Sequence, residues 1–286
     1  MKHETIIPFA NCFSHNQRET DLVFVGLPDD SQSSYKRGCS QAPARLRTAY
    51  NGHCYNATTE LGVDLSGKVA DLGDVPSRDT WEHTAIAYRE LAQSLFQSGK
   101  TPFLAGGDHA VTVPIVQAAA VLREPIQVIQ IDAHADLYPE FEGNPHSHAC
   151  TATRLLEMEH VHSLTQIGIR TLNERQAQVT HTFSGKLKIV HARDFVDGAI
   201  DIPEDLRIYL TIDLDALDPA YAPGVSHPVP GGLTSRQVLD FIQNLQVALI
   251  AVDVVEVNPP LDSHDRTAVL AAKLLHEAMG KTIQLR

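Results

Sequence analysis

Long apolar stretches are absent from this sequence of 286 residues, and cysteine is scarce. No apolar run approaches the roughly 18 residues that a membrane-spanning helix needs, and the N-terminus lacks the pattern of a signal peptide. The four cysteines include no CxxC pair, which suits a reducing cytoplasm where disulfides are rare. These absences predict a soluble cytoplasmic protein.

Basic residues are also in the minority. Lysine and arginine number 23 against 35 aspartates and glutamates, so the formal net charge is −12 with the histidines neutral. A surface of this sign argues against binding to nucleic acid or to an anionic membrane, and it is compatible with a small cationic substrate. We therefore expect neither nucleic acid nor a membrane as a partner.

Internal repeats, linkers and low-complexity segments are missing as well. Hydrophobic residues make up 43 % of the chain, which is enough for a sizeable core. The sequence therefore predicts a single domain over residues 1–286, in which residues 1–20 form a polar, irregular arm packed on the surface.

Strand patterns and helix patterns alternate along the chain, which predicts an α/β fold. Seven or eight strands alternating with helices imply one parallel sheet with helices on both faces. Strands are expected over 21–27, 69–75, 101–104, 126–131, 163–170, 187–191, 207–215 and 248–257. Helices are expected over 42–50, 80–98, 111–122, 149–159, 172–182, 235–246 and 265–279.

The segment DAHAD, residues 132–136, places three metal-competent side chains directly after an apolar run. Asp132, His134 and Asp136 have the spacing i, i+2, i+4, so they share one face if the strand geometry continues to its end. Carboxylates with an imidazole suit a divalent ion such as manganese, zinc or nickel. The alternative is a solvated acidic turn after a strand.

Two further segments strengthen the metal interpretation. Asp213 and Asp215 follow the apolar run 208–212, and the GGDH turn at 106–109 ends with His109. Two carboxylates at a buried strand end repel each other and need a compensating cation. Six donors exceed what one tetrahedral zinc uses, and they fit two adjacent ions about 3.5–4 Å apart. A purely structural metal is the remaining alternative.

Together these segments resemble a known family, the ureohydrolases, which comprise the arginases, the agmatinases and their relatives. The resemblance covers most of the chain from about residue 22 onward. It rests on GGDH at 106–109, DAHAD at 132–136, SHAC at 147–150, DLDALDP at 213–219, APG at 222–224, GGL at 231–233 and EVNPP at 256–260. It implies a three-layer α/β/α fold with a mostly parallel sheet of about eight strands, two Mn²⁺ ions, release of urea from a guanidino group, and a homo-oligomer, either a trimer or a hexamer.

The resemblance also implies a role for each metal-competent residue. The first manganese would be held by His109, Asp132, Asp136 and Asp213. The second would be held by Asp132, His134, Asp213 and Asp215. Asp132 and Asp213 would then bridge the two ions.

The same resemblance implies the substrate contacts. His148 matches an active-site histidine that shuttles a proton or contacts the substrate, and Glu256 matches the glutamate that pairs with the guanidinium. Asp253 matches an acidic position near the metals and is assigned, with Asn144, to substrate binding. The alternatives are an ordinary surface histidine for His148 and a strand-end salt bridge for Glu256.

Chemistry alone leads to the same expectation. A guanidinium carbon is a poor electrophile, and two cations lower the pKa of a bridging water so that hydroxide exists near neutral pH. Glu256 can hold the planar guanidinium through a bidentate pair. The departing amine needs a proton, which water, Asp136 or His148 can deliver. The expected reaction is therefore attack of a metal-bridging hydroxide, with Asp136, His148 and Glu256 as catalytic residues.

The loop 137–148 suggests the substrate. It contains Glu140 and Glu142 and no lysine or arginine, so an ammonium group is favoured over a carboxylate at that end of the substrate. We therefore expect hydrolysis of agmatine to putrescine and urea. The alternatives are an arginase, a formimidoylglutamase (suggested by PGVS at 223–226) or a hydrolase of another guanidino acid or of guanidine, and, from another class, an inactive metal-binding scaffold or sensor.

Overall fold

Eight parallel strands form one sheet in the order β2-β1-β3-β8-β7-β4-β5-β6. The structure is a computed structural model that describes residues 8–14, 20–196, 200, 202–203 and 205–286. The strands are β1 (Leu22–Leu27), β2 (Val69–Asp74), β3 (Thr101–Gly106), β4 (Ile126–Ile131), β5 (Val161–Ile169), β6 (Leu187–His191), β7 (Arg207–Asp213) and β8 (Leu249–Val255). The expected parallel sheet is confirmed.

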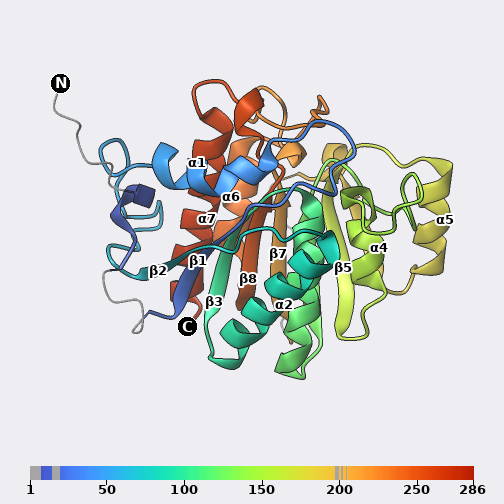
Figure 1. The fold of residues 1–286 in the computed structure, drawn as a ribbon, viewed down its shortest axis with the longest axis horizontal. Helices are drawn as coiled ribbons and strands as arrows, with labels where there is room; N and C mark the ends of the chain where they lie inside the picture. Colours follow the sequence, from blue (N-terminus) through green and yellow to red (C-terminus); the bar gives the residue numbers. More distant parts are fainter. Residues whose placement is uncertain (1–7, 15–19, 197–199, 201, 204) are drawn as a thin grey trace.

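Helices cover both faces of the sheet, which completes the expected three-layer α/β/α fold (Figure 1). They are α1 (Ala42–Ala49), α2 (Trp81–Gln97), α3 (Thr112–Ala118), α4 (Thr151–Leu156), α5 (Glu174–Thr182), α6 (Ser235–Asn244) and α7 (Arg266–Gln284). Helices α1, α6 and α7 pack on one hydrophobic cluster, and the other four pack on the second. None of the helices in the described ranges has the length and apolar character to span a membrane.

The two hydrophobic clusters lie on opposite faces of the sheet because side chains alternate along each strand. In β1, Val23 and Val25 belong to the cluster under α2 and α3, whereas Phe24 belongs to the cluster under α1 and α7. Strands buried on both faces read as continuous apolar runs, which is why their positions were predictable from the sequence.

The described part of the N-terminal arm is not a surface feature. Phe9 is fully buried, and its ring lies 5.2 Å from Phe24 and 5.7 Å from Tyr50. The expectation of a surface-packed arm is therefore wrong for residues 8–14, because aromatic side chains in this polar segment complete the core under α1. Residues 1–7 and 15–19 of the predicted arm lie outside the described residues.

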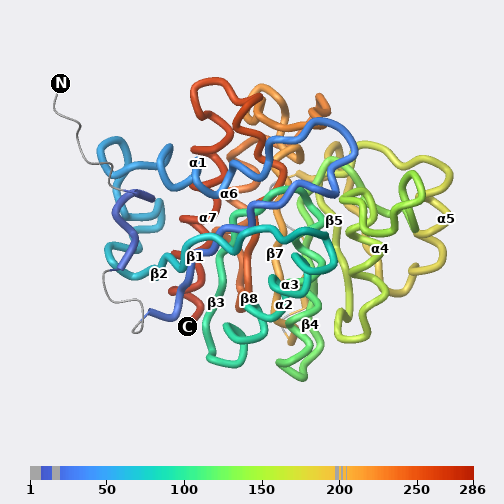
Figure 2. Tube along the Cα trace, viewed as in Figure 1, coloured from blue at the N-terminus to red at the C-terminus, as the bar shows by residue number. Residues whose placement is uncertain are grey.

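The loop that follows β1 lies at the same edge of the sheet as the loops that follow β4, β7 and β8 (Figure 2). It is fastened to the GGDH turn after β3. The backbone N–H of Asp108 donates to the carbonyl of Asp29 (3.0 Å), and the backbone N–H of Gln32 donates to Asp108 Oδ2 (2.9 Å). Gly107 makes this approach possible, because a Cβ there would lie 1.6 Å from the Asp29 carbonyl oxygen.

We predict that Gly107→Ala destabilises the protein, because the new methyl group meets rigid backbone instead of a movable side chain. Overpacking of this kind typically lowers the free energy of unfolding by about 1–3 kcal/mol. Urea unfolding followed by circular dichroism measures the change. Gly185→Ala is the matched control, since a Cβ at Gly185 meets nothing within 4 Å. Equal unfolding midpoints for the two variants would contradict the close backbone packing.

Candidate active site

Four neighbouring strands in the middle of the sheet, β3, β8, β7 and β4, carry the site at their carboxyl ends. Because they run parallel, the segments that follow them emerge at the same edge, where open α/β sheets place their ligands. Strand β3 leads to His109, β4 to the DAHAD segment, β7 to Asp213 and Asp215, and β8 to Glu256.

The aspartates converge through turns and not along strands. Strand β4 ends before Asp132, and β7 ends at Asp213, so the expectation that strand alternation aligns these side chains is wrong. Asp132 Oδ1 accepts the backbone N–H of His134 (2.6 Å), and Asp213 Oδ1 accepts that of Asp215 (2.8 Å). Such bonds to the residue two positions ahead fold the chain into tight turns. Asp136 then adopts a left-handed conformation, with φ at +50°.

His109 stands at the centre of the carboxylates. Its Nδ1 atom lies 3.1 Å from Asp132 Oδ2, 3.2 Å from Asp136 Oδ2 and 3.4 Å from Asp213 Oδ2. This nitrogen is buried and has no hydrogen-bond partner among the residues that the structure describes, while Nε2 lies 3.0 Å from Thr211 Oγ1. A buried nitrogen that faces three carboxylate oxygens without bonding to any of them fits a metal ligand.

Two groups of side chains can each hold a metal ion, and the groups share one aspartate. They consist of His109, Asp132 and Asp213, and of Asp132, His134 and Asp215. Within each group the ligand atoms lie within 4.8 Å of one another. Asp136 is next to the first group, because its Oδ2 atom lies 3.2 Å from Nδ1 of His109. The structure therefore brings all six predicted metal ligands together.

Burial and mutual repulsion shift the pKa values of these groups. Burial raises the pKa of Asp213 well above its usual range, and Asp215 and Asp132 raise it further. Burial also raises the pKa of Asp132 and of Asp136. For His109, burial alone would lower the pKa, but the surrounding carboxylates raise it well above its usual value. The carboxylates thus have too little positive charge around them to be ionised together. Divalent cations at this position would supply that charge.

Buried polar side chains hold the ligands in place. Gln130 Nε2 donates to Asp132 Oδ2 (2.7 Å), and Gln166 Nε2 donates to Gln130 Oε1 (2.9 Å). These glutamines lie on β4 and β5, where a strand of continuous apolar residues would otherwise be expected. Hydrogen bonds of this kind orient carboxylate ligands around a metal.

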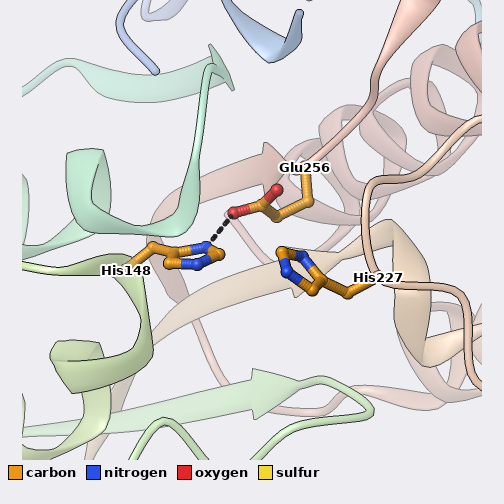
Figure 3. A group of neighbouring side chains, drawn as sticks. All are labelled: His148, His227 and Glu256. Carbon is orange, nitrogen blue, oxygen red and sulfur yellow. Dashed lines mark hydrogen bonds and ion pairs between the residues drawn. The ribbon is translucent and has the colours of Figure 1, made fainter. Parts of the chain in front are cut away.

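Glu256 forms another wall of the site and has a left-handed backbone, with φ at +62°. Its N–H donates to the carbonyl of Gly107 (2.9 Å), and its Oε1 accepts the backbone N–H of His109 (3.0 Å). His148 Nδ1 lies 2.8 Å from the same oxygen (Figure 3). Burial alone would raise the pKa of Glu256, but the adjacent His148 lowers it below its usual range. The carboxylate is therefore held ionised.

His148 connects Glu256 to the loop after β1. Its Nε2 atom accepts the backbone N–H of Ser34 (3.2 Å) and lies 2.8 Å from Ser34 Oγ. The ring proton then sits on Nδ1 and is donated to Glu256. Burial alone would lower the pKa of His148, but the Glu256 carboxylate raises it. The pair thus keeps a proton next to a carboxylate inside the site.

A cavity of about 290 Å³ lies between the predicted metal ligands and the Glu256–His148 pair. Asp136, Asp213 and Asp215 line it together with His148 and Glu256. The wall next to helix α5, which we call the α5 wall, is formed by Tyr138, Phe141, Thr171, Asn173 and Gln176. Buried carboxylates, His148 and a polar surface therefore line one cavity.

Two predicted substrate contacts do not reach this cavity. Asn144 Nδ2 donates instead to Gln32 Oε1 (2.8 Å), which ties two loops together. Asp253 is fully buried within β8, where its Oδ2 accepts the hydroxyls of Tyr209 (2.6 Å) and Thr112 (2.9 Å). Asp253, three residues before Glu256, therefore lies beneath the site. Neither Asn144 nor Asp253 lines the cavity, so both assignments to substrate binding are corrected.

His227 lines the cavity, and the sequence did not single it out. It lies beside His148 and Glu256, with its ring centroid 5.2 Å from that of His148 (Figure 3). The only signal was a histidine in the proline- and glycine-rich loop 218–233, immediately after the PGVS segment.

Comparisons with known proteins agree with this geometry. The model of the family described as "Arginase family" matches residues 20–280. Arginase 1, mitochondrial, of Arabidopsis thaliana is 36% identical over 278 residues, with 90% of this chain and 80% of the relative covered. An agmatinase of Bacillus anthracis is 30% identical over 266 residues, with 91% of both chains covered.

A solved structure has the same fold. The agmatine ureohydrolase of Thermoplasma volcanium superposes with a TM-score of 0.86 at 29% identity, covering 99% of this chain and 96% of the other. The family match spans most of the chain and includes all four strands that carry the site. This chain therefore belongs to the arginase family and is a metal-dependent hydrolase.

Proposed function

We propose that this chain releases urea from a small guanidino compound, using two divalent metal ions. One observation carries the proposal: four of the six metal-competent side chains, His134, Asp136, Asp213 and Asp215, line a single cavity together with the Glu256–His148 pair. The other two, His109 and Asp132, are grouped with these residues. A scaffold or sensor that only binds metal needs no buried carboxylate held ionised on the opposite wall. The experiments below therefore measure metal content and urea release separately.

The metal ions, Mn²⁺ by resemblance to the family, would be held by the two ligand groups around His109 and His134. The donor set fits, because the orphaned nitrogen of His109 and the uncompensated carboxylates both require a cation. Bound there, two divalent ions lower the pKa of water and stabilise negative charge that develops during hydrolysis.

Glu256 is proposed to hold the guanidinium group. A planar cation with N–H donors matches a buried carboxylate, and such pairs are stronger than neutral hydrogen bonds. The Gly107 carbonyl accepts the backbone N–H of Glu256, and the His109 N–H donates to its Oε1 atom. Glu256 therefore presents its carboxylate in one orientation. A guanidinium held in this orientation would have its carbon in the cavity that Asp136 and Asp213 line.

His148 is proposed to supply the proton that the departing amine requires. The proton lies on Nδ1 beside Glu256, so it is next to the bound guanidinium, and Ser34 holds the far side of the ring. Asp136, whose pKa is raised by burial and then by Asp132, can carry a proton in the same cavity. Proton transfer from a positioned side chain typically accelerates such a step about 10²–10⁴-fold.

The acidic loop residues that favoured agmatine do not line the cavity. Glu140 and Glu142 are exposed, and Glu140 lies 3.7 Å from the Arg175 guanidinium. The α5 wall contains amides and hydroxyls instead of carboxylates. The guanidinium of Arg175 lies 5.8 Å from the centroid of the Tyr138 ring in this wall. The far end of the substrate thus meets polar groups and a nearby cation.

These features favour a guanidino acid such as L-arginine, whose carboxylate can accept hydrogen bonds from the α5 wall and is attracted by Arg175. Agmatine is the second candidate. The similarity to agmatinases over nearly the whole chain supports it, as does the excess of carboxylates around the cavity. The similarity to plant arginases supports the first candidate.

Asp132 is shared by both ligand groups, so its loss is predicted to affect both metal ions. In Asp132→Asn, manganese content after dialysis is expected to fall by at least one ion per chain, with nearly all urea release lost. Metal analysis by mass spectrometry and a urea assay measure the two quantities. Glu142→Gln, at an exposed acidic position outside the cavity, is the control. Two tightly held ions and normal turnover in Asp132→Asn would refute the ligand assignment.

His148 lies outside the metal ligand groups around His109 and His134, so its removal is predicted to slow turnover without releasing metal. His148→Ala is expected to lose about 10²–10⁴-fold in kcat with unchanged manganese content. His146→Ala removes an exposed histidine from the same loop and is expected to behave as the wild type. Loss of a manganese ion from His148→Ala alone would show that this histidine belongs to one of the two ligand groups around His109 and His134.

The substrate is predicted from the α5 wall. We expect a higher kcat/KM for L-arginine than for agmatine under identical manganese loading. Arg175→Gln is expected to lower kcat/KM for arginine several-fold and to leave agmatine unchanged, because only arginine has a carboxylate to attract. A higher kcat/KM for agmatine in the wild type would restore the agmatinase assignment.

A further inference from the structure

We propose that His148, His227 and Glu256 form a third metal site, which takes a zinc-type divalent ion. The three side chains come from separate segments and point toward one another across the cavity (Figure 3). Their ligand atoms all lie within 4.8 Å of one another. The site is distinct from the two ligand groups around His109 and His134, with which it shares no residue.

His227 is the residue that makes this a site and not only an ion pair. Its ring is held by contacts with Tyr35, His134 and His148, at centroid distances of 5.6, 6.0 and 5.2 Å. Within the described part of the chain, neither of its ring nitrogens has a hydrogen-bond partner. An imidazole that is positioned by ring packing, and whose nitrogens are left unused beside a carboxylate, is available to coordinate an ion.

The donor set determines which ion binds. Two imidazoles and one carboxylate, with a fourth position open to solvent, form a donor set found in zinc enzymes. Imidazole ligands favour zinc, nickel and copper over manganese and magnesium. The two groups around His109 and His134 are richer in carboxylates, which suit manganese better. The third site is therefore expected to select a different ion from the same solution.

The surroundings of His148 can accommodate the change in protonation. Metal binding through Nδ1 removes the proton that now faces Glu256, so the neutral ring carries its proton on Nε2. Ser34 Oγ lies 2.8 Å from Nε2 and can accept that proton, in place of the hydrogen bond that the backbone N–H of Ser34 now donates to Nε2. Metal-bound histidines usually donate their second N–H to a neighbouring acceptor in this way.

Charge sets the strength of binding. When ionised, the five carboxylates of Asp132, Asp136, Asp213, Asp215 and Glu256 exceed the charge of two divalent ions by one negative unit. A guanidinium neutralises this excess, whereas a third divalent ion overshoots it by one. The third ion is therefore expected to bind more weakly than the first two, and its occupancy should depend on the zinc concentration.

A zinc ion at this site and a guanidinium exclude each other, because both need Glu256. This consequence rests on the proposed function, in which Glu256 holds the substrate. Zinc would then inhibit in competition with the guanidino compound. The existence of the third site does not depend on that proposal, so binding and inhibition can be tested separately.

Zinc stoichiometry tests the site directly. Metal-free protein is equilibrated with increasing free Zn²⁺, and bound zinc per chain is measured by mass spectrometry. We expect three ions in the wild type and two in His227→Ala and in His227→Gln, the second of which preserves more of the side-chain volume. His146→Ala, which removes an exposed histidine outside the cavity, should bind three. Thermal melts of each variant confirm that it is folded.

Two ions in the wild type, or three in both folded His227 variants, would overturn the third site. A second measurement uses manganese-loaded protein and zinc as an inhibitor of urea release. The zinc concentration for half inhibition should rise about tenfold or more in the His227 variants, and inhibition in the wild type should be competitive. Absence of any urea release from manganese-loaded wild type would overturn the proposed function, while the zinc count would still decide the site.

Discussion

Concentrated negative charge at the centre of the sheet is the constraint on which the rest of this structure depends. Four aspartates lie at the ends of β4 and β7, most of them shielded from water, and burial of unpaired charges is strongly unfavourable. Cations resolve this conflict, and the free energy of their binding then contributes to folding. The buried side chains around the ligands fit this requirement. Gln130, held by Gln166, orients the Asp132 carboxylate, and Thr211 contacts the His109 ring, so these groups are positioned before an ion arrives.

The sequence predicted the fold, and it predicted that six metal-competent side chains lie close together, because both features depend on short-range patterns. Buried parallel strands leave continuous apolar runs, and ligands that follow such runs must meet at one edge of the sheet. The local geometry was predicted less well. The spacing of Asp132, His134 and Asp136 suggested strand alternation, whereas aspartate-capped turns bring the side chains together. Spacing alone does not distinguish these two conformations.

Features that depend on distant contacts were not predictable. Whether Glu140 faces the cavity or solvent is decided by the path of a loop, and Arg175 on another element now lies beside it. Asp253 was assigned to substrate binding from the family resemblance, but its carboxylate accepts hydrogen bonds from Tyr209 and Thr112 inside the fold. His227 reaches the site because a long proline- and glycine-rich loop folds back over it. In each case residue type was informative, and the direction of the side chain required the structure.

The position of β8 has a consequence for how the molecule is made. This strand is last in the sequence, yet it lies in the interior of the sheet between β3 and β7, which it joins through parallel pairings on both sides. Until β8 is synthesised, no strand connects the half-sheet formed by β2, β1 and β3 to the half-sheet formed by β7, β4, β5 and β6. Most of the polypeptide is therefore synthesised before the two half-sheets can be joined, and Glu256 enters the site as part of the event that joins them. Assembly of the candidate site and closure of the sheet thus occur in a single late step of folding.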